Sequence, residues 1–505
     1  MPEGKELYDV IVVGAGNAGL CSALSANECG AKVIILEKAP QALRGGNSCY
    51  TLTTRLPYRG AEDIIALIPD MSKTEIEERD FNSYSEADFY ADLMRATRGK
   101  VDSEIAEIVA HNAYSTWKWV AGFGVRWIPF APGSWGCKGE KVDGKFQAYP
   151  GVPIEFSGGG KDYNTKMFEA AEKKGIKVVY EAQAVKLLTA EKERRMQGVR
   201  ILHEGSQYKD IFGKAVILAC GGFEASAEMR SKYLGPNWDL VVVRGSRYNT
   251  GDGIHMALEL GAVTTGHWSA CHAAQVDAAA PRFADSPWRE AGKSISRHSY
   301  HLGILINLLG ERFIDEGEDF NQFTYAKLGK VVLQQPNQLS IQIVDSKVKH
   351  LMLSAYKQAS PIVGTSIAEL ADNLSSELGV DRDRAIWTIE DFNRAAQEGI
   401  FNHGILDGKC TKGITPKKSN WAQPLDTPPF LAYPVQCGIT FTFGGIEVDK
   451  KLSRVVDLTG IPIKGLYAAG EIVGFWYHNY PSGADLTQGA VMGKIAGAEA
   501  AAYAR

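Results

Sequence analysis

The chain has 505 residues, of which 45% are hydrophobic and 23% charged, as expected for a globular protein with room for two or three domains. Its formal net charge of −4 and the lack of a basic run argue against nucleic acid or anionic lipid as a partner. No apolar stretch reaches the roughly 18 residues that a membrane helix needs, so direct membrane insertion is not expected.

Cysteine and histidine usage favours a cytoplasmic protein without a metal site. The eight cysteines are scattered without Cys-x-x-Cys spacing, which predicts reduced thiols. The ten histidines form no His-Glu-x-x-His or similar pattern, so no metal is expected. Charged residues open the chain and lead directly into the first predicted strand, which leaves no room for a signal peptide.

A glycine-rich turn near the N-terminus carries the clearest functional signal. A buried strand over residues 10–14 ends at Gly14, and Gly14, Gly16 and Gly19 have the G-x-G-x-x-G spacing at the start of a small-residue helix. Such glycines allow a tight turn, close approach of a pyrophosphate and helix–sheet packing, with the phosphates on free N–H groups of the helix. The alternative is a turn with a purely structural role.

The next segments strengthen the nucleotide prediction. A second buried strand over residues 32–36 ends at Glu37, which is placed to accept hydrogen bonds from a ribose diol. Strand, glycines, helix, strand and acid in one unit predict a dinucleotide site. The loop that follows, with Arg44 and residues 45–48, is polar and permissive, so it is expected to wrap a phosphate or flavin edge, unless it is a simple surface turn.

Similar sequence recurs later in the chain. A strand from residue 214 ends on paired glycines, and the helix after residue 249 leaves Thr250 and Asp252 available to a diol or phosphate. A last strand closes at Glu471, and the helix after Tyr480 offers its N-terminal N–H groups to the electron-rich edge of a flavin ring. The composition shifts over residues 269–429, which indicates an inserted domain.

The order of these motifs resembles one family. The N-terminal unit and the segments 45–48, 219–222, 249–253 and 468–471 are similar to those of the FAD-dependent fumarate reductase, succinate dehydrogenase and 3-ketosteroid dehydrogenase superfamily, over nearly the whole chain. The resemblance implies an α/β fold in which a discontinuous Rossmann-like FAD-binding domain, residues 1–268 and 430–505, is interrupted by an α+β capping domain, residues 269–429. Substrate is then expected between the two domains, against the isoalloxazine ring.

Finer matches resemble the tricarballylate dehydrogenase branch of this superfamily. They lie in the segments 44–48, 319–326, 439–445 and 479–483. This branch implies FAD-dependent dehydrogenation of a carbon–carbon single bond in a small polycarboxylate, with hydride transfer to flavin N5. It also implies a membrane-associated iron–sulfur protein as electron acceptor. No histidine stands near the Gly45–Gly46 loop, so non-covalent FAD is expected.

Three positions depart from the fumarate reductases. Phe320 stands where the resemblance implies a proton-delivering arginine, Phe441 replaces a carboxylate-binding histidine, and Tyr480 lies in the run that elsewhere holds a second arginine. His272 matches a histidine of the family site. Fumarate reduction is therefore not expected. The Tyr480–Pro481 pair is closer to ketosteroid dehydrogenases, so an enzyme acting on an apolar enone or ketone stays an alternative.

The predicted catalytic and anchoring residues must supply a base, a polarising donor and a carboxylate anchor. Each also has a structural alternative, such as interdomain packing for the tyrosines or a surface ion pair for the arginine. Arg297 and His298 are weaker candidates from the cap. The candidates are His272, Tyr480, Tyr325, Tyr300 and Arg55.

The predicted cofactor-binding residues follow from the motifs and the resemblance together. They are Gly14, Gly16, Ala18, Gly19, Glu37, Lys38, Arg44, Gly45, Gly46, Asn47, Ser48, Ala184, Gly221, Gly222, Asn249, Thr250, Asp252, Gly470, Glu471, Gly483, Ala484 and Leu486. A different class of function also stays open. The missing arginine and histidine would suit a flavoprotein that has lost catalysis and serves in electron transfer or assembly.

Overall fold

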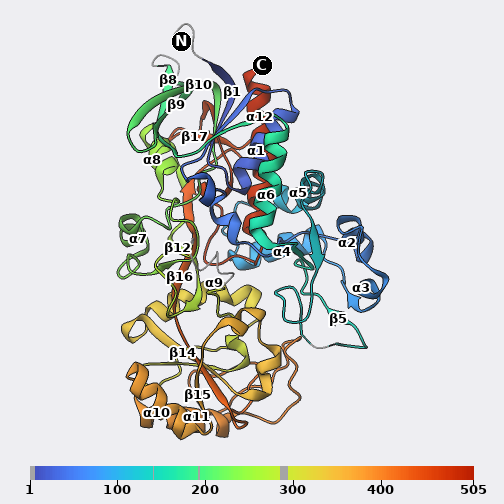
Figure 1. The fold of residues 1–505 in the computed structure, drawn as a ribbon, viewed down its shortest axis with the longest axis vertical. Helices are drawn as coiled ribbons and strands as arrows, with labels where there is room; N and C mark the ends of the chain where they lie inside the picture. The colour runs from blue at the N-terminus through green and yellow to red at the C-terminus, as the bar shows by residue number, and fades with distance from the viewer. Residues whose placement is uncertain (1–5, 140, 191–193, 285–293) are drawn as a thin grey trace.

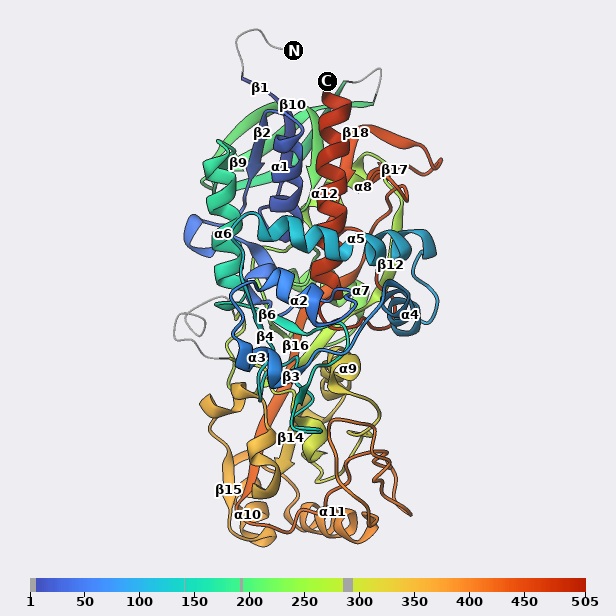
Figure 2. The same cartoon turned by 90° about the vertical axis from the view of Figure 1, so that its right-hand side faces the viewer.

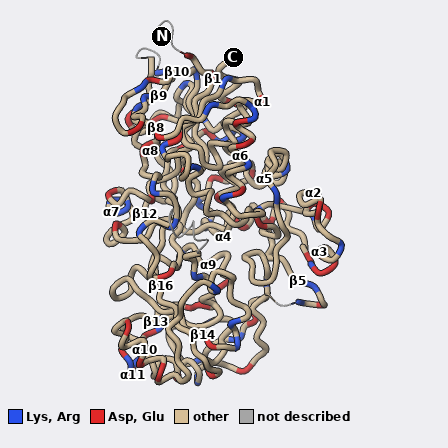
Figure 3. The backbone as a smooth tube through the Cα atoms, in the orientation of Figure 1, with Lys and Arg blue, Asp and Glu red and all other residues tan. Residues whose placement is uncertain are grey.

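The computed structural model describes residues 6–139, 141–190, 194–284 and 294–505; the expectation about the start of the chain rests partly on residues 1–5, outside these ranges. The molecule is elongated, with one sheet near both termini and a second sheet at the opposite end (Figure 1). Two long strands, β12 (Thr264–Asp277) and β16 (Phe430–Ile446), run along the long axis between them. Lys and Arg are interspersed with Asp and Glu over both parts (Figure 3).

The first sheet has the strand order β17-β18-β10-β1-β2-β7, in which β18, β10, β1, β2 and β7 are parallel and β17 is antiparallel to β18. Its central strand β1 is a continuous apolar run because both of its faces are covered, and Val10, Ile11 and Val12 are fully buried. β10, β9 and β8 continue as antiparallel pairs. The strands are β1 (Leu7–Val13), β2 (Val33–Leu36), β7 (Lys177–Val179), β8 (Ala182–Ala190), β9 (Arg195–His203), β10 (Gln207–Leu218), β17 (Arg454–Val456) and β18 (Pro462–Ala468).

Three helices lie side by side over one face of this sheet, as Figure 2 shows, namely α1 (Asn17–Glu28), α6 (Gly159–Lys173) and α12 (Ala484–Ala504). α5 (Ser103–Ala121) crosses over α12. α1 and α12 approach closely because glycines face the neighbouring backbone. A Cβ at Gly493 would lie 2.5 Å from the Ala18 carbonyl oxygen, and one at Gly497 would lie 2.2 Å from that of Ser22.

The second sheet joins the cap to the two long strands. Its order is β11-β16-β14-β13, and β12 and β15 also pair with β16. Residue 268 lies within β12 and residue 430 begins β16, so both predicted domain boundaries fall on these strands; the division into domains itself stays a prediction. β11 (Val242–Val243) joins this sheet from outside the predicted cap. The cap elements are β13 (Ile304–Asn307), β14 (Leu339–Val344), β15 (Ile362–Gly364), α9 (Asn321–Leu333), α10 (Ile367–Leu378) and α11 (Arg382–Ala395).

Smaller elements surround this framework, and the predicted α/β class is confirmed. The capping box of Ser85 with Asp88 begins α4. The remaining elements are α2 (Ala61–Leu67), α3 (Lys73–Glu77), β3 (Arg79–Asp80), α4 (Glu86–Ala96), β4 (Trp127–Pro129), β5 (Phe146–Gln147), β6 (Ile154–Phe156), α7 (Ala227–Leu234) and α8 (Asp252–Glu259).

The α1–α12 contact yields a stability prediction. Gly497→Val places a branched side chain against the Ser22 carbonyl, so we expect a loss of about 1–3 kcal/mol of folding free energy from overpacking. Chemical denaturation followed by circular dichroism measures it. Ala502→Val, on the exposed side of the same helix, is the control and should stay within about 1 kcal/mol of the parent, because it costs only helix propensity.

Candidate functional site

One cavity of about 430 Å³ runs from the N-terminus of α1 to the cap, past the N-terminus of α12. Its lining includes Gly14 and Gly16 at one end and His298 and Tyr325 at the other. The volume lies in the range of cofactor and ligand sites. A nucleotide and a substrate can therefore share one continuous space.

The glycine turn forms the nucleotide end of this cavity. Gly14 has φ +98°, which favours glycine, and Gly16 caps α1 without a side-chain hydrogen bond. A Cβ at Gly16 would meet nothing closer than 3.7 Å, at the Gly45 carbonyl and the Ser48 hydroxyl. The space in front of Gly16 is thus open to the cavity. This cradle fits a pyrophosphate against the helix N-terminus.

Glu37 and Lys38 organise the same end. The Glu37 carboxylate accepts hydrogen bonds of 2.8 Å from the N–H groups of Ala15 and Ala39, and burial raises its pKa. Its oxygens keep further lone pairs for a ribose hydroxyl. Lys38 Nζ pairs with Asp252 Oδ2 at 2.6 Å and also donates to the Thr250 hydroxyl. The two groups predicted to meet a diol or phosphate are therefore held by Lys38.

Sixteen of the twenty-two predicted cofactor residues line the cavity. They are Gly14, Gly16, Ala18, Glu37, Lys38, Gly46, Asn47, Ser48, Ala184, Gly221, Asn249, Asp252, Gly470, Glu471, Gly483 and Leu486. Gly19, Arg44, Gly45, Gly222, Thr250 and Ala484 lie outside its lining.

Local packing explains why two of these residues, Gly19 and Arg44, lie outside the cavity lining. Gly19 is pressed against the Gly14 carbonyl, where a Cβ would come within 2.0 Å, so it packs helix on strand. The guanidinium of Arg44 lies 4.1 Å from the centre of the Phe168 ring and donates to the Tyr180 hydroxyl at 2.6 Å. Arg44 therefore supports the loop from behind rather than facing the cavity.

Two buried glutamates, Glu224 and Glu471, are neighbours beside the cavity. Glu224 Oε1 accepts from the side-chain amides of Asn47 at 2.7 Å and Asn249 at 2.6 Å, and Glu471 Oε1 accepts from the Thr442 N–H at 2.9 Å. Burial, and then the neighbouring Glu224, raise the pKa of Glu471 well above its usual range. We infer that Glu471 keeps its proton.

Three elements bring aromatic and imidazole rings together at the substrate end. His272 lies on β12 next to a β-bulge, Tyr325 on α9, and Tyr480 in the loop before α12. The His272 ring centre lies 4.9 Å from that of Tyr325 and 5.0 Å from that of Tyr480. The two tyrosine hydroxyls are hydrogen-bonded to each other. Phe441 completes this group, with its ring centre 5.1 Å from that of His272.

The cavity histidines are neutral and available to a ligand. His272 is 2% exposed, and neither of its ring nitrogens has a partner in the described part of the chain; the same holds for Nε2 of His298. Burial, and then the cation of Arg244, lower the pKa of both imidazoles well below the usual range. Buried nitrogens without partners indicate a site whose ligand supplies the missing hydrogen bonds.

Arg244 is a cavity residue that the sequence did not point to. It follows the two-residue strand β11 and donates Nε to the Ser296 hydroxyl at 3.1 Å and Nη1 to the Thr440 hydroxyl at 3.0 Å. No motif surrounds it, and only the pairing of β11 with β16 turns it toward the cavity. Sequence alone therefore carried no signal for its position.

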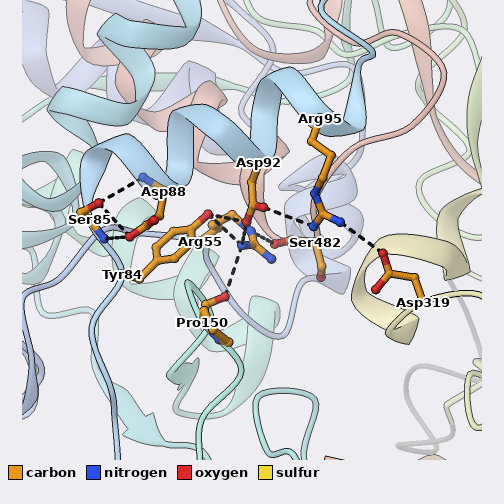
Figure 4. Close-up of polar contacts among 9 residues, drawn as sticks. All are labelled: Arg55, Tyr84, Ser85, Asp88, Asp92, Arg95, Pro150, Asp319 and Ser482. Carbon is orange, nitrogen blue, oxygen red and sulfur yellow. Dashed lines mark hydrogen bonds and ion pairs between the residues drawn. The ribbon is translucent and has the colours of Figure 1, made fainter. Parts of the chain in front are cut away.

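Arg55, predicted as a carboxylate anchor, lies outside the cavity lining. It is 1% exposed, and it donates to the Asp92 carboxylate at 3.0 Å, the Tyr84 hydroxyl at 3.0 Å and the Ser482 carbonyl at 2.9 Å (Figure 4). Asp92 is joined in turn to Arg95. The Arg55 prediction is corrected accordingly: its charge holds the loop before α12.

Three other predicted positions also lie outside the cavity lining. The Tyr300 hydroxyl is hydrogen-bonded to Thr324, and burial raises its pKa. Arg297 forms an ion pair of 2.6 Å with Asp277. The Phe320 ring packs on Trp421, with centres 5.8 Å apart. Tyr300 and Arg297 are buried within the cap, whereas the half-buried Phe320 also packs on Tyr149, with ring centres 5.3 Å apart.

Comparisons with known proteins agree with this geometry. A family model described as an FAD binding domain matches residues 9–63 and 77–485. The chain is 26% identical to a probable fumarate reductase of Shewanella frigidimarina, over 99% of this chain and 76% of that protein. It is 25% identical to 4-oxocyclohexanecarboxylate 2-dehydrogenase of Sinomonas cyclohexanicum, over 99% and 94%. The open conformation of a flavocytochrome c3 fumarate reductase has a TM-score of 0.71 at 25% identity, covering 99% of this chain and 79% of that one.

The fold and the cavity define a flavin-dependent oxidoreductase acting on carbon–carbon single or double bonds. The chain belongs to the FAD binding domain family, and its cofactor is FAD. The predicted superfamily is thereby supported, whereas the tricarballylate branch is not singled out. Within the described ranges, no helix has the length and apolarity needed to span a bilayer, and no cluster of side chains is suited to a metal ion.

The glycine cradle predicts a selective loss of cofactor. In Gly16→Val the new side chain occupies cavity space where the pyrophosphate is expected, but it does not clash with neighbouring protein atoms. We therefore expect FAD retention to be lost while the flavin-free protein keeps its Tm within a few degrees. Flavin absorbance per protein after gel filtration, with Tm of the stripped proteins, measures both. A yellow variant with parental flavin content would contradict the placement.

The glutamate pair predicts a pH-dependent gain of stability. Because the folded-state pKa of Glu471 is raised, its ionisation destabilises the native protein as the pH rises above the ordinary glutamate range. The glutamine in Glu471→Gln stays neutral at every pH, as a protonated glutamate would be. The Tm of this variant should therefore exceed that of the parent at pH ~8 and match it at pH ~5. Glu398→Gln, at an exposed position, is the charge-matched control. Equal Tm differences at both pH values would contradict a protonated Glu471.

Proposed function

We propose that this protein reduces, or in reverse forms, a carbon–carbon double bond conjugated to a carbonyl or carboxylate of a small substrate. The observation that carries the proposal is the hydroxyl pair of Tyr325 and Tyr480 beside unpartnered His272, all at one end of the cofactor cavity. Bound FAD supplies or accepts the hydride. The residues of the chain must then bind the substrate and handle the proton.

The tyrosine pair is suited to donate a proton. Burial, and then Tyr325, raise the pKa of Tyr480 well above its usual range, and burial raises the pKa of Tyr325 to about 12. Both hydroxyls are therefore protonated at neutral pH. In the pair one hydroxyl donates to the other, which leaves one O–H for a substrate carbon or carbonyl oxygen. The protein is thus proposed to favour the reductive direction.

Two substrate classes are carried forward. The sequence resemblance favours dehydrogenation of a tricarballylate-like polycarboxylate, whereas the aromatic walls formed by Phe441, Trp135 and Trp476 favour a cyclic enone or ketone. The name of the Sinomonas relative, which refers to a cyclic oxo acid, supports the second class. We propose the cyclic carbonyl class as the better fit to these walls.

Electron exchange is proposed to involve a protein partner rather than a nicotinamide nucleotide. The motifs account for one dinucleotide site, and FAD fills it. A membrane-associated iron–sulfur protein, implied by the tricarballylate branch, is the partner that this proposal names. The relative from Shewanella frigidimarina and the solved flavocytochrome c3 enzyme carry names of reductases, in agreement with the direction proposed above.

Tyr480→Phe and Tyr325→Phe test the proton donor. Each removes a hydroxyl and keeps the ring, so we expect kcat to fall by about 10²–10⁴-fold with FAD content unchanged. Tyr300→Phe, whose hydroxyl lies outside the cavity, should keep kcat within about threefold, and stopped-flow reoxidation of the reduced flavin provides the rates. Parental rates in both site variants would contradict the assignment.

An anaerobic panel separates the substrate classes. Oxidised protein is mixed with tricarballylate and with cyclic ketones, and photoreduced protein with cis-aconitate and with cyclic enones, while the flavin band is followed. Cyclic compounds should change the flavin band and the polycarboxylates should not. A response to the polycarboxylates alone would restore the tricarballylate interpretation, and no response to any compound would favour a non-catalytic electron carrier.

A further inference from the structure

Resting on the reaction proposed above, we propose that Arg244 anchors a single substrate carboxylate, and that the cavity takes a monocarboxylate with a cyclic or aromatic, apolar body. Arg244 is half-buried and lines the cavity. Its guanidinium donates to two neutral hydroxyls, those of Ser296 and Thr440. Among the residues that the structure describes, no carboxylate pairs with it. A partly buried cation without an anion is costly, and an anionic ligand relieves that cost.

Arg244 is also fixed in place before any ligand arrives. Its backbone N–H donates to the Ile439 carbonyl at 2.7 Å, and the Thr440 hydroxyl that holds Nη1 comes from the next residue of β16. The Ser296 hydroxyl, from a separate segment of the chain, accepts the hydrogen bond from Nε. A preorganised guanidinium loses little conformational freedom on binding, and its planar donors match the geometry of a carboxylate.

The charge of Arg244 reaches the reacting groups. It lowers the pKa of His272 and His298, after the effect of burial, and it also acts on Tyr325 and Tyr480 in the direction that favours their ionised forms. A carboxylate bound to Arg244 therefore lies within electrostatic range of the hydroxyl pair. Anchoring and proton transfer are parts of one site.

The rest of the cavity lining does not suit a substrate with several carboxylates. Lys38 is the other lysine or arginine among the described lining residues, and it lies at the nucleotide end, paired with Asp252. Near Arg244 the lining holds neutral histidines, tyrosines and apolar rings such as Trp135 and Phe441. It also holds the carboxyl of Asp485, whose pKa burial raises to about 6 and which adds no positive charge. A tricarboxylate would leave two carboxylates against these groups without cations, at a high desolvation cost. One carboxylate and an apolar ring satisfy the same walls.

The test compares matched ligands on the flavin-loaded protein. Cyclohexenecarboxylate and its amide have nearly the same shape and differ in charge, and cis-aconitate supplies three carboxylates. Titrations followed by flavin absorbance give the Kd of each for the parent, Arg244→Met, Arg244→Lys and Arg247→Met. Arg247 is exposed and outside the cavity lining, so its variant controls for the loss of one positive charge.

We expect Arg244→Met to weaken carboxylate binding by about 10–100-fold, as for the loss of a charged hydrogen bond, while the Kd of the amide changes less than about threefold. Arg244→Lys should fall between, and Arg247→Met should match the parent. Equal losses for acid and amide would overturn the anchor, and tighter binding of cis-aconitate than of the monocarboxylate by the parent would overturn the substrate class. Failure of every unsaturated probe to reoxidise the reduced flavin would instead refute the proposed reaction, since the binding comparison stands apart from turnover.

Discussion

The antiparallel pairing of β12 with β16 is the interaction on which the rest of the molecule depends. These strands belong to the cap sheet, yet they also place His272 opposite Phe441 at the substrate end of the cavity. The same β16 residues that pair with β11 position Arg244. Because two ladders that share β16 fix all three side chains, the relative placement of cap and cavity is set by strand register rather than by flexible loops.

The substrate end combines one cation, Arg244, and the buried carboxyl of Asp485 with several neutral polar groups. Desolvation keeps His272 and His298 uncharged and keeps the tyrosine hydroxyls protonated, and the charge of Arg244 acts on all of these groups. Farther out, Arg55, Asp92, Arg95 and Asp319 form a chain of ion pairs that joins the loop before α12 to the cap (Figure 4). Charge is therefore used mainly behind the site, where it fixes loops, and sparingly inside it.

The sequence predicted the features that depend on neighbouring residues, namely the buried strands and the glycine turn. The buried runs of β1, β2, β10 and β18 followed from the apolar pattern, and the glycine spacing located the nucleotide end. Arg55 and Arg244 show the limit. The distance of Arg55 from the glycine loop in the sequence does not reveal whether its side chain points into the cavity or away from it. Arg244 faces the cavity only because β11 pairs with residues of β16 that lie almost two hundred positions away. The two long strands were missed because cap and core share them, which no local pattern reveals.

The close contact of α1 with α12 has a consequence for how the chain is made. α1 begins at residue 17, whereas the glycines that receive it lie at residues 493 and 497, and β18 reaches the sheet only shortly before. A ribosome adding about 5–20 residues per second leaves the apolar face of α1 uncovered for roughly half a minute or more. The nascent chain is therefore a natural client for chaperones that shield hydrophobic surface until synthesis has passed α12.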